Sequence, residues 1–167
     1  ASNIAEICSN PDVDIVVEVM GGVEPAKTFV LSALNAGKSV VTSNKELFCK
    51  FNHELEKAAK KNNCGLFYEA SCVGGVPVIR ALLDNLQGNK VLSMMGIING
   101  TTNYILTKMT DEGASYEEVL KEAQKLGYAE ANPTADVEGY DATYKLSILS
   151  SLAFHTKIPY TKIYREG

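Results

Sequence analysis

The chain of 167 residues is 46% hydrophobic and 22% charged, and it carries a formal net charge of −4. This length allows a buried core and predicts one domain, or one domain with part of another. Lysine and arginine form no basic run that could neutralise phosphates, and no apolar stretch reaches the ~18 residues of a membrane span. We therefore expect neither a nucleic acid nor a membrane as a partner.

The cysteines and the first residues bear on the compartment of the protein. Cys8, Cys49, Cys64 and Cys72 form no CxxC pair and no cysteine–histidine metal spacing. Four free thiols are typical of a protein in a reducing compartment. The chain also lacks an initial charged segment followed by an apolar one, which is the pattern of a secretion signal. These features predict a cytoplasmic protein.

The first seventy residues alternate between apolar strands and amphipathic helices. A helix in this part opens with Ser43-Asn44-Lys45-Glu46, which has the S-x-x-E pattern of a capping box. The alternation predicts a partial Rossmann-like parallel sheet of α/β class, and the missing first βαβ unit suggests an N-terminal truncation. The predicted elements are strands over residues 14–20, 39–42 and 66–69 and helices over residues 26–34 and 43–62.

The second half mixes helices with one long apolar strand, so an α+β domain is predicted after a boundary near residue 70. Ser115 and Glu118 form a second capping-box pattern. We therefore divide the chain into domains over residues 1–70 and 71–167. The predicted elements are helices over 77–86, 101–109, 115–126 and 139–154, a strand over 90–98 and a polar loop over 127–138.

The last predicted helix carries a charged pair at the start of an apolar stripe. Asp141 and Lys145 stand four residues apart and so share one face of the helix. Ile148, Leu149 and Leu152 continue that face. A lysine on an apolar face needs a paired carboxylate, and such pairs occur in catalytic sites. An ordinary surface pair, worth about 0.3–0.5 kcal/mol, gives the same spacing, so the residues alone leave both interpretations open.

An acidic loop precedes this helix and contains Glu130, Asp136 and Glu138. Several carboxylates near a lysine suit an ammonium-bearing substrate or a proton relay. A solvated acidic loop is the commoner explanation of such a composition, and the residues alone favour it.

Three further features lie at the predicted carboxyl ends of the strands, where α/β sheets bind ligands. Gly21 and Gly22 allow close approach of a cofactor, although a plain tight turn would explain them equally well. Lys45 lies in the first turn of its helix, where the helix dipole disfavours a cation, and it could meet a phosphate, a carbonyl or a carboxylate. A lysine exposed there by chance explains this position equally well. Glu69 and the glycines after it could hold a hard cation through oxygen ligands.

Five segments resemble, in order and with matching intervals, the motifs of homoserine dehydrogenases. The last two make the resemblance specific, because glycine pairs alone are common. These segments are VVEVMGGVEPA (16–26), VVTSNKE (40–46), YEASCVGGVPVI (68–79), GIINGTTNYILTKM (96–109) and GYAEANPTADVEGYDATYK (127–145).

The resemblance implies a reversible reduction of aspartate 4-semialdehyde to L-homoserine with NADP or NAD, on the route to threonine and methionine. It implies that residues 1–70 are the C-terminal part of a dinucleotide-binding domain. Residues 71–167 would then belong to a substrate-binding, catalytic and dimerisation domain. The implied partners are the small-molecule substrate and a second copy of the chain in a homodimer.

The resemblance also implies roles for individual residues. Lys145 matches the proton donor to the aldehyde oxygen, and Asp141 matches the carboxylate that positions the substrate. Glu130 matches the glutamate that binds the substrate amino group, and Asp136 matches a further acidic residue of the site. Lys45 matches a lysine between nicotinamide and substrate.

A monovalent cation, usually sodium, is implied as well. Glu69, Cys72, Gly74 and Val76 match positions whose carbonyl groups bind it. The chain departs from the family pattern at Val73, where a glycine is common in the cation loop.

Two further departures concern the substrate and cofactor sites. Asn132 stands where the family usually has an aspartate, which removes one charge near the substrate site. The chain also contains no GxGxxG fingerprint for a dinucleotide.

The missing fingerprint keeps a second interpretation open, that of a non-catalytic fragment which folds and dimerises without binding the cofactor tightly. Another semialdehyde dehydrogenase fits less well. That chemistry usually employs a cysteine nucleophile with a histidine, and the sequence shows no cysteine and histidine at a suggestive spacing.

Overall fold

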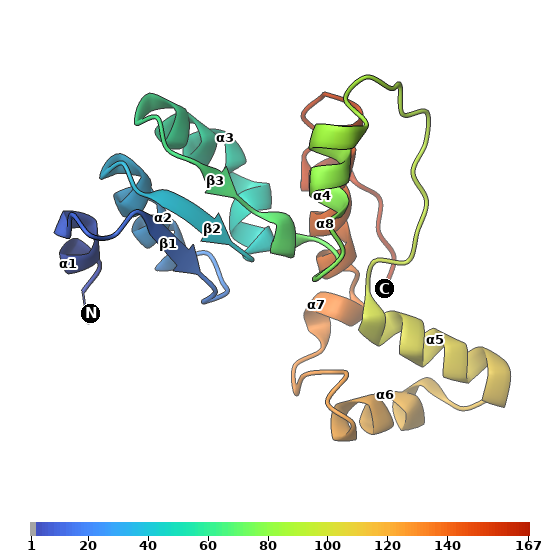
Figure 1. The fold of residues 1–167 in the computed structure, drawn as a ribbon. Coiled ribbons are helices and arrows are strands. Elements are labelled where there is room, and N and C mark those ends of the chain that lie inside the picture. The colour runs from blue at the N-terminus through green and yellow to red at the C-terminus, as the bar shows by residue number, and fades with distance from the viewer. Residues whose placement is uncertain (1–2) are drawn as a thin grey trace. The chain divides into compact units, whose positions relative to one another are not determined.

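Three short parallel strands form the sheet in the first part of the chain (Figure 1). They are β1 (Ile15–Glu18), β2 (Ser39–Thr42) and β3 (Leu66–Phe67), in the order β1-β2-β3. The computed structural model describes residues 3–167, which form two compact units that meet in sequence at Lys90 and Val91. The predicted α/β class is confirmed, whereas the domain boundary at residue 70 stays a prediction.

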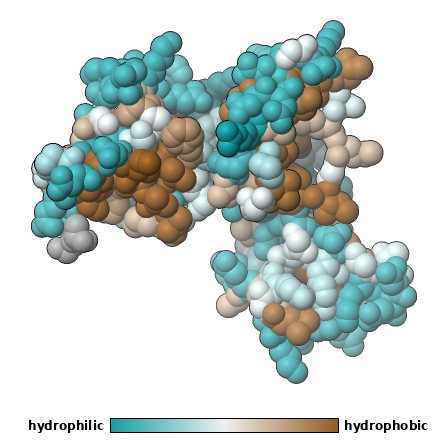
Figure 2. Space-filling model, in the orientation of Figure 1, coloured by the Kyte–Doolittle hydropathy of each residue, from teal (hydrophilic) through white to brown (hydrophobic). Residues whose placement is uncertain are grey.

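Two amphipathic helices cover one face of this sheet. They are α2 (Ala26–Asn35) and α3 (Lys45–Lys61), and both bury apolar side chains such as Leu34 and Leu55 completely. A short first helix, α1 (Ile4–Ser9), was not predicted from the sequence. On strands β1 and β3, Ile15, Val17 and Phe67 stay exposed, and brown apolar atoms gather over the first unit in Figure 2.

The start of α3 corrects the predicted capping box at Ser43. Asn44, one residue further along, is the N-cap, and its side-chain oxygen accepts the backbone N–H of Leu47 at 3.0 Å. An asparagine at this position satisfies the same free N–H groups as a serine does. Lys45 is therefore the first residue of the helix, in the first turn as predicted.

The first unit ends in three short helical turns. These are η1 (Glu69–Ser71), α4 (Val78–Arg80) and the π-helical turn η2 (Ala81–Asn85). The carboxylate of Glu69 accepts the backbone N–H groups of Ile79 and Arg80 at 2.9 and 2.8 Å. This contact caps the first turn of the helix predicted over 77–86, which the structure resolves into α4 and η2.

The second unit is built from helices and contains a small core of Ile105, Val119, Ala123 and Ala129. Ser115 and Glu118 form the predicted capping box. The elements are α5 (Gly100–Glu112), α6 (Tyr116–Lys125), α7 (Thr134–Val137), α8 (Tyr140–Ala153) and the turn η3 (Tyr160–Lys162).

The predicted strand over residues 90–98 is wrong for the part of the chain that the structure describes. Residues 91–99 have no strand pairing there, and Leu92, Met95 and Ile97 are exposed. A β-strand requires a neighbour to satisfy its backbone N–H and C=O groups. Apolar composition predicted the strand, but no strand of residues 3–167 lies against this segment.

Candidate functional site

The charged pair predicted from helical spacing is present at the start of α8. The Nζ atom of Lys145 lies 2.6 Å from Oδ2 of Asp141. The two side chains are only 15% and 8% exposed, so this is a largely buried ion pair and not a surface pair. Removing either partner would leave a buried charge uncompensated, which is costly.

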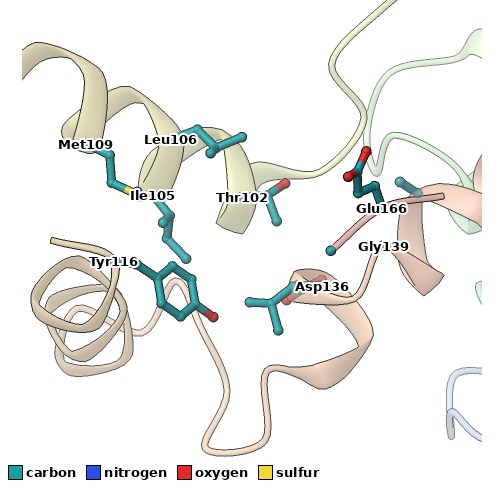
Figure 3. Close-up of a pocket in the computed structure, with 11 residues that line it drawn as sticks. Thr102, Ile105, Leu106, Met109, Tyr116, Asp136, Gly139 and Glu166 are labelled. Atoms are coloured by element: carbon teal, nitrogen blue, oxygen red, sulfur yellow. The ribbon is translucent and has the colours of Figure 1, made fainter.

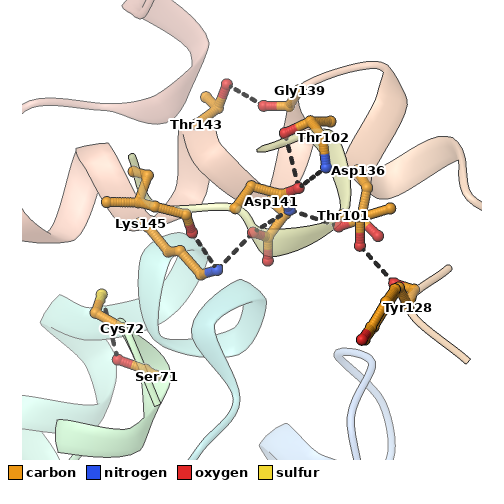
Figure 4. A network of polar contacts seen from close by, with 12 residues as sticks. Ser71, Cys72, Thr101, Thr102, Tyr128, Asp136, Gly139, Asp141, Thr143 and Lys145 are labelled. Carbon is orange, nitrogen blue, oxygen red and sulfur yellow. Dashed lines mark hydrogen bonds and ion pairs between the residues drawn. The ribbon is translucent and has the colours of Figure 1, made fainter. Parts of the chain in front are cut away.

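Two consecutive residues before α5 contact this pair from outside α8. The backbone carbonyl of Ile98 accepts a hydrogen bond from Lys145 Nζ at 2.8 Å. The side-chain amide of Asn99 donates to Asp141 Oδ2 at 2.9 Å and to Asp136 Oδ1 at 2.7 Å. We call Asn99, Asp136, Asp141 and Lys145 the polar cluster; Figure 4 shows its aspartates and lysine.

Sequence reasoning missed Asn99, although a signal was available. An asparagine directly before a helical segment is a typical N-cap, and the segment NGTTNYIL has this arrangement. The Oδ1 atom of Asn99 indeed accepts the backbone N–H of Thr102 at 2.8 Å. The contacts to two aspartates 37 and 42 residues away could not be read from that pattern.

The loop before α8 is tied to the start of α5. The hydroxyl of Thr101 donates to the carbonyl of Tyr128 at 2.7 Å. Asn132 accepts the hydroxyl of Thr134 at 2.7 Å, so it shapes the turn that leads into α7, on which Asp136 lies. Glu130 is exposed in this loop, and its role as a partner of the substrate amino group stays a prediction.

A mostly apolar cavity of about 460 Å³ adjoins the polar cluster at Asp136 (Figure 3). Helices α5, α6 and α7, the start of α8, and residues 166–167 contribute its walls. The residues that line it are Thr102, Ile105, Leu106, Met109, Tyr116, Asp136, Val137, Gly139, Ala142, Glu166 and Gly167.

In the first unit, a hydrogen-bonded network fixes the carboxyl ends of β1 and β2. The buried carboxylate of Glu18 accepts the hydroxyl of Thr42 at 2.6 Å and the backbone N–H of Met20 at 2.7 Å. The amide of Asn44 donates to the carbonyl of Gly22 at 2.6 Å. The turn after β1 and the start of α3, which carries Lys45, are thereby held together.

Gly21 and Gly22 both adopt the left-handed conformation, with φ of 77° and 71°. A Cβ atom built on either residue would meet nothing within 4 Å. The requirement for glycine here is therefore conformational, since other residues rarely adopt such angles. The backbone on this turn is exposed and open to a ligand.

The predicted cation loop contains an unusual backbone conformation. Val73 has φ of +57°, which is uncommon for any residue with a Cβ and an outlier for a β-branched one. Gly74 has the same φ of 57°. A glycine, which the resemblance leads one to expect at position 73, would adopt this geometry without strain. The carboxylate of Glu69 accepts two backbone N–H groups at the start of α4.

Two kinds of feature are absent from residues 3–167, a metal-binding cluster and a membrane-spanning helix. No group of three or more His, Cys, Asp or Glu side chains in that range could hold a metal ion. In the same range, no helix has the length and apolar character needed to cross a membrane.

Two family models match the chain. The model described as "Homoserine dehydrogenase, NAD binding domain" matches residues 1–69, and the model "Homoserine dehydrogenase" matches residues 77–167. Together these matches cover both halves of the sequence.

Curated relatives with the same description are about half identical to the chain. The homoserine dehydrogenase of Mycobacterium tuberculosis H37Rv is 53% identical over 165 residues, which are 99% of this chain and 37% of that protein. The homoserine dehydrogenase of Bacillus subtilis is 48% identical over 99% of this chain and 38% of its own length. The chain thus spans somewhat more than a third of these relatives.

Solved structures give the same result for the fold. A homoserine dehydrogenase from Thiobacillus denitrificans matches with a TM-score of 0.95 and 47% identity, covering 99% of this chain and 38% of that one. A hyperthermophilic archaeal homoserine dehydrogenase in complex with NADPH matches with a TM-score of 0.85 and 35% identity, covering 93% of this chain and 48% of that one.

Proposed function

Because the chain belongs to the homoserine dehydrogenase family, we propose that it carries the substrate site of an enzyme that interconverts aspartate 4-semialdehyde and L-homoserine. NADP or NAD would be the redox cofactor. The observation that carries this proposal is the buried Asp141–Lys145 pair and its contacts to Ile98 and Asn99.

Lys145 is the proposed proton donor. A bound reduced nicotinamide would supply a hydride to the aldehyde carbon, and the carbonyl oxygen would then gain negative charge. A positioned ammonium group stabilises that charge and gives the oxygen its proton, which forms the hydroxyl of homoserine. Asp141 and the carbonyl of Ile98 bind the Nζ atom of Lys145 at 2.6 and 2.8 Å. These contacts support the proposal, because they orient the ammonium group. In the reverse reaction, the neutral amine of Lys145 would accept the hydroxyl proton.

The charges of the polar cluster suit an amino-acid substrate. Two aspartates and one lysine leave one negative charge in excess, and the α-ammonium group of homoserine could compensate it. Asp136 and Asp141 are therefore proposed to bind the substrate together with Glu130. This requires the exposed loop around Glu130 to bring its carboxylate to the substrate amino group.

Gly21, Gly22 and Lys45 are the residues that we propose for cofactor binding. They follow strands β1 and β2 at their carboxyl ends, the edge at which open parallel sheets bind dinucleotides. The left-handed glycines leave the backbone accessible, and the hydrogen bond from Asn44 to Gly22 ties this turn to the helix that begins with Lys45. Lys45 is proposed to lie between the nicotinamide and the substrate.

A monovalent cation, such as sodium, is proposed at the turn that contains Glu69, Cys72, Gly74 and Val76. Its ligands would be backbone carbonyl oxygens, which are hard donors of the kind that sodium prefers. The left-handed backbone at residues 73 and 74 supports the proposal, because it turns the chain sharply in this segment.

The domain boundary, the assembly and the compartment complete the proposal. Residues 1–70 would belong to the dinucleotide-binding domain and residues 71–167 to the substrate-binding domain; the family matches, which part between residues 69 and 77, support this division. We propose a homodimer. The four free cysteines support a location in the cytoplasm.

The test is the homoserine-dependent reduction of NADP or NAD by the full-length protein, followed by nicotinamide absorbance. We expect Lys145→Ala to lower turnover by at least about 100-fold, as for loss of a general acid, with little change in cofactor affinity. Lys145→Arg keeps the positive charge beside Asp141 but cannot give up a proton, so it should also be slow.

Lys121→Ala, which removes an exposed lysine on α6, serves as the matched control and should behave as wild type. Near-normal turnover in both Lys145 variants would overturn the assignment of Lys145. Absence of homoserine turnover in the wild-type protein, with either cofactor, would overturn the proposed function.

A further inference from the structure

Asn99 is the one member of the polar cluster that carries no charge, and it lies at its centre. It is buried, and its side chain takes part in four hydrogen bonds. Two of them reach Asp136 and Asp141, and two come from Thr102, whose backbone N–H and hydroxyl donate at 2.8 and 2.9 Å. Thr102, Asp136 and Asp141 lie together in Figure 4.

The orientation of the Asn99 amide follows from these partners. A backbone N–H can only donate, so the group that faces Thr102 must be the acceptor oxygen. The NH₂ group then faces the two carboxylates, which can only accept when they are ionised. Each of its two hydrogens has one aspartate as its partner, so a flipped amide would lose contacts on both sides.

We propose that Asn99 is a positioning residue for the reaction, and this inference rests on the proposed function. It binds the carboxylate of Asp141 on the same oxygen that holds Lys145 Nζ. A displacement of Asp141 would therefore displace the ammonium group that protonates the substrate oxygen. Through its second hydrogen it holds Asp136 beside Asp141, so both carboxylates meet the substrate in one fixed arrangement.

The Asn99 side chain links the two carboxylates by hydrogen bonds, and we call this link the carboxylate bridge. A neutral bridge has an electrostatic advantage over a positively charged one. Two carboxylates within reach of one nitrogen repel each other, and two N–H dipoles lower that repulsion without cancelling either charge. An arginine or lysine in this place would leave the cluster without its excess negative charge. The cluster would then lose its attraction for the α-ammonium group of the substrate.

The competing explanation is that Asn99 only caps α5. Ser115 offers a matched comparison, because it caps α6 in the same unit through its hydroxyl and has no contact to the cluster aspartates among its hydrogen bonds. Ser115→Ala removes a helix cap alone. Asn99→Ala removes a helix cap and the carboxylate bridge. Asn99→Ser keeps a capping oxygen and loses the bridge.

The experiment compares these three variants with wild type in the full-length protein, by steady-state kinetics with homoserine and cofactor varied separately and by thermal unfolding. We expect Asn99→Ala and Asn99→Ser each to lower kcat/KM for homoserine by about 100-fold, the cost of misplacing catalytic groups. Both kcat and the KM for homoserine should change. The KM for the cofactor should stay within about twofold of wild type, because the cofactor site lies on other residues.

Ser115→Ala should unfold at a lower temperature and keep wild-type kinetics. The inference is overturned if Asn99→Ser recovers wild-type kcat/KM, or if Asn99→Ala matches Ser115→Ala in all kinetic constants. Should Asn99→Ala fail to fold, Asn99→Ser decides alone. An inactive wild-type enzyme would instead overturn the proposed function, so the two failures are distinct.

Discussion

Asn44 in the first unit and Asn99 in the second cap a helix in the same way, but their amide groups have different partners. In both, the side-chain oxygen accepts a backbone N–H three residues ahead, from Leu47 and from Thr102. In both, the amide nitrogen extends beyond the helix. Asn44 donates to the backbone carbonyl of Gly22, whereas Asn99 donates to the carboxylates of two aspartates.

The difference separates two ways of building a site. The contact of Asn44 fixes the path of the backbone, and the ligand would meet main-chain groups on a glycine turn. The contacts of Asn99 fix ionised side chains, and a ligand there would contact charged groups. Substitutions in the first region should therefore affect cofactor binding through geometry, and those in the second should affect substrate chemistry and stability through electrostatics.

The largest effect on stability is expected from Asp141→Ala. It leaves Lys145 as a largely buried cation without its carboxylate, which typically costs about 3–5 kcal/mol. Urea unfolding of the full-length protein measures the change. The control is Asp84→Ala in the first unit, whose partner Arg80 and own side chain are 78% and 58% exposed; an exposed i,i+4 pair contributes about 0.3–0.5 kcal/mol. Equal losses of unfolding free energy in the two variants would contradict the view that the buried Asp141–Lys145 pair contributes more to stability than an exposed pair.

A smaller loss of stability is expected from Asn44→Ala. Loss of an asparagine cap costs about 0.5–2 kcal/mol of unfolding free energy, and Gly22 loses its contact with α3. The KM for the cofactor should rise while the KM for homoserine stays unchanged, the reverse of the result expected at Asn99. Asn44→Asp, which keeps the capping oxygen, should retain more of the stability. A rise in the KM for homoserine alone would contradict the comparison.

The smallest effect on stability is expected at an ion pair of the second unit that lies outside the polar cluster. Lys108 Nζ lies 2.8 Å from Glu122 Oε1, and the hydroxyl of Tyr104 donates to the same atom at 2.9 Å. The hydrogen bond from Lys108, followed by that from Tyr104, lowers the pKa of Glu122. A lowered folded-state pKa gives stability that is present above the unfolded pKa and is lost as the pH falls through the folded pKa.

We therefore expect Glu122→Gln to unfold at a lower temperature than wild type at neutral pH. The difference should shrink as the pH falls below about 4, where a free glutamate becomes protonated. Thermal unfolding from neutral to acidic pH measures it. The same substitution at Glu117, an exposed residue in the first turn of α6, is the control. A difference that is constant with pH would contradict the assignment.

Local patterns of the sequence predicted much of this structure. Strand β2 has the predicted bounds, Ser115 and Glu118 form the predicted capping box, and Asp141 pairs with Lys145 as their spacing required. Each of these features depends on residues within one element. The helix that Ser43 was expected to cap begins instead after Asn44, since both residues can cap and only the backbone path decides between them.

Features that depend on distant contacts were not predictable in the same way. The role of Asn99 as a bridge depends on Asp136 and Asp141, which fold onto it from another part of the sequence. The strand expected over residues 90–98 was inferred from apolar composition, but a strand also needs a neighbour to pair with. Apolar composition alone does not show whether such a neighbour exists, and Leu92, Met95 and Ile97 of this segment are exposed.

The central claim is that the polar cluster binds the substrate with its reacting oxygen at Lys145. The most direct test is a crystal structure of the full-length protein with homoserine and the oxidised cofactor. We predict that the homoserine hydroxyl lies within about 3.2 Å of Lys145 Nζ, with the α-ammonium group facing the carboxylates of the cluster and Glu130. Homoserine bound in an ordered position without contact to Lys145, Asp136 or Asp141 would contradict the claim.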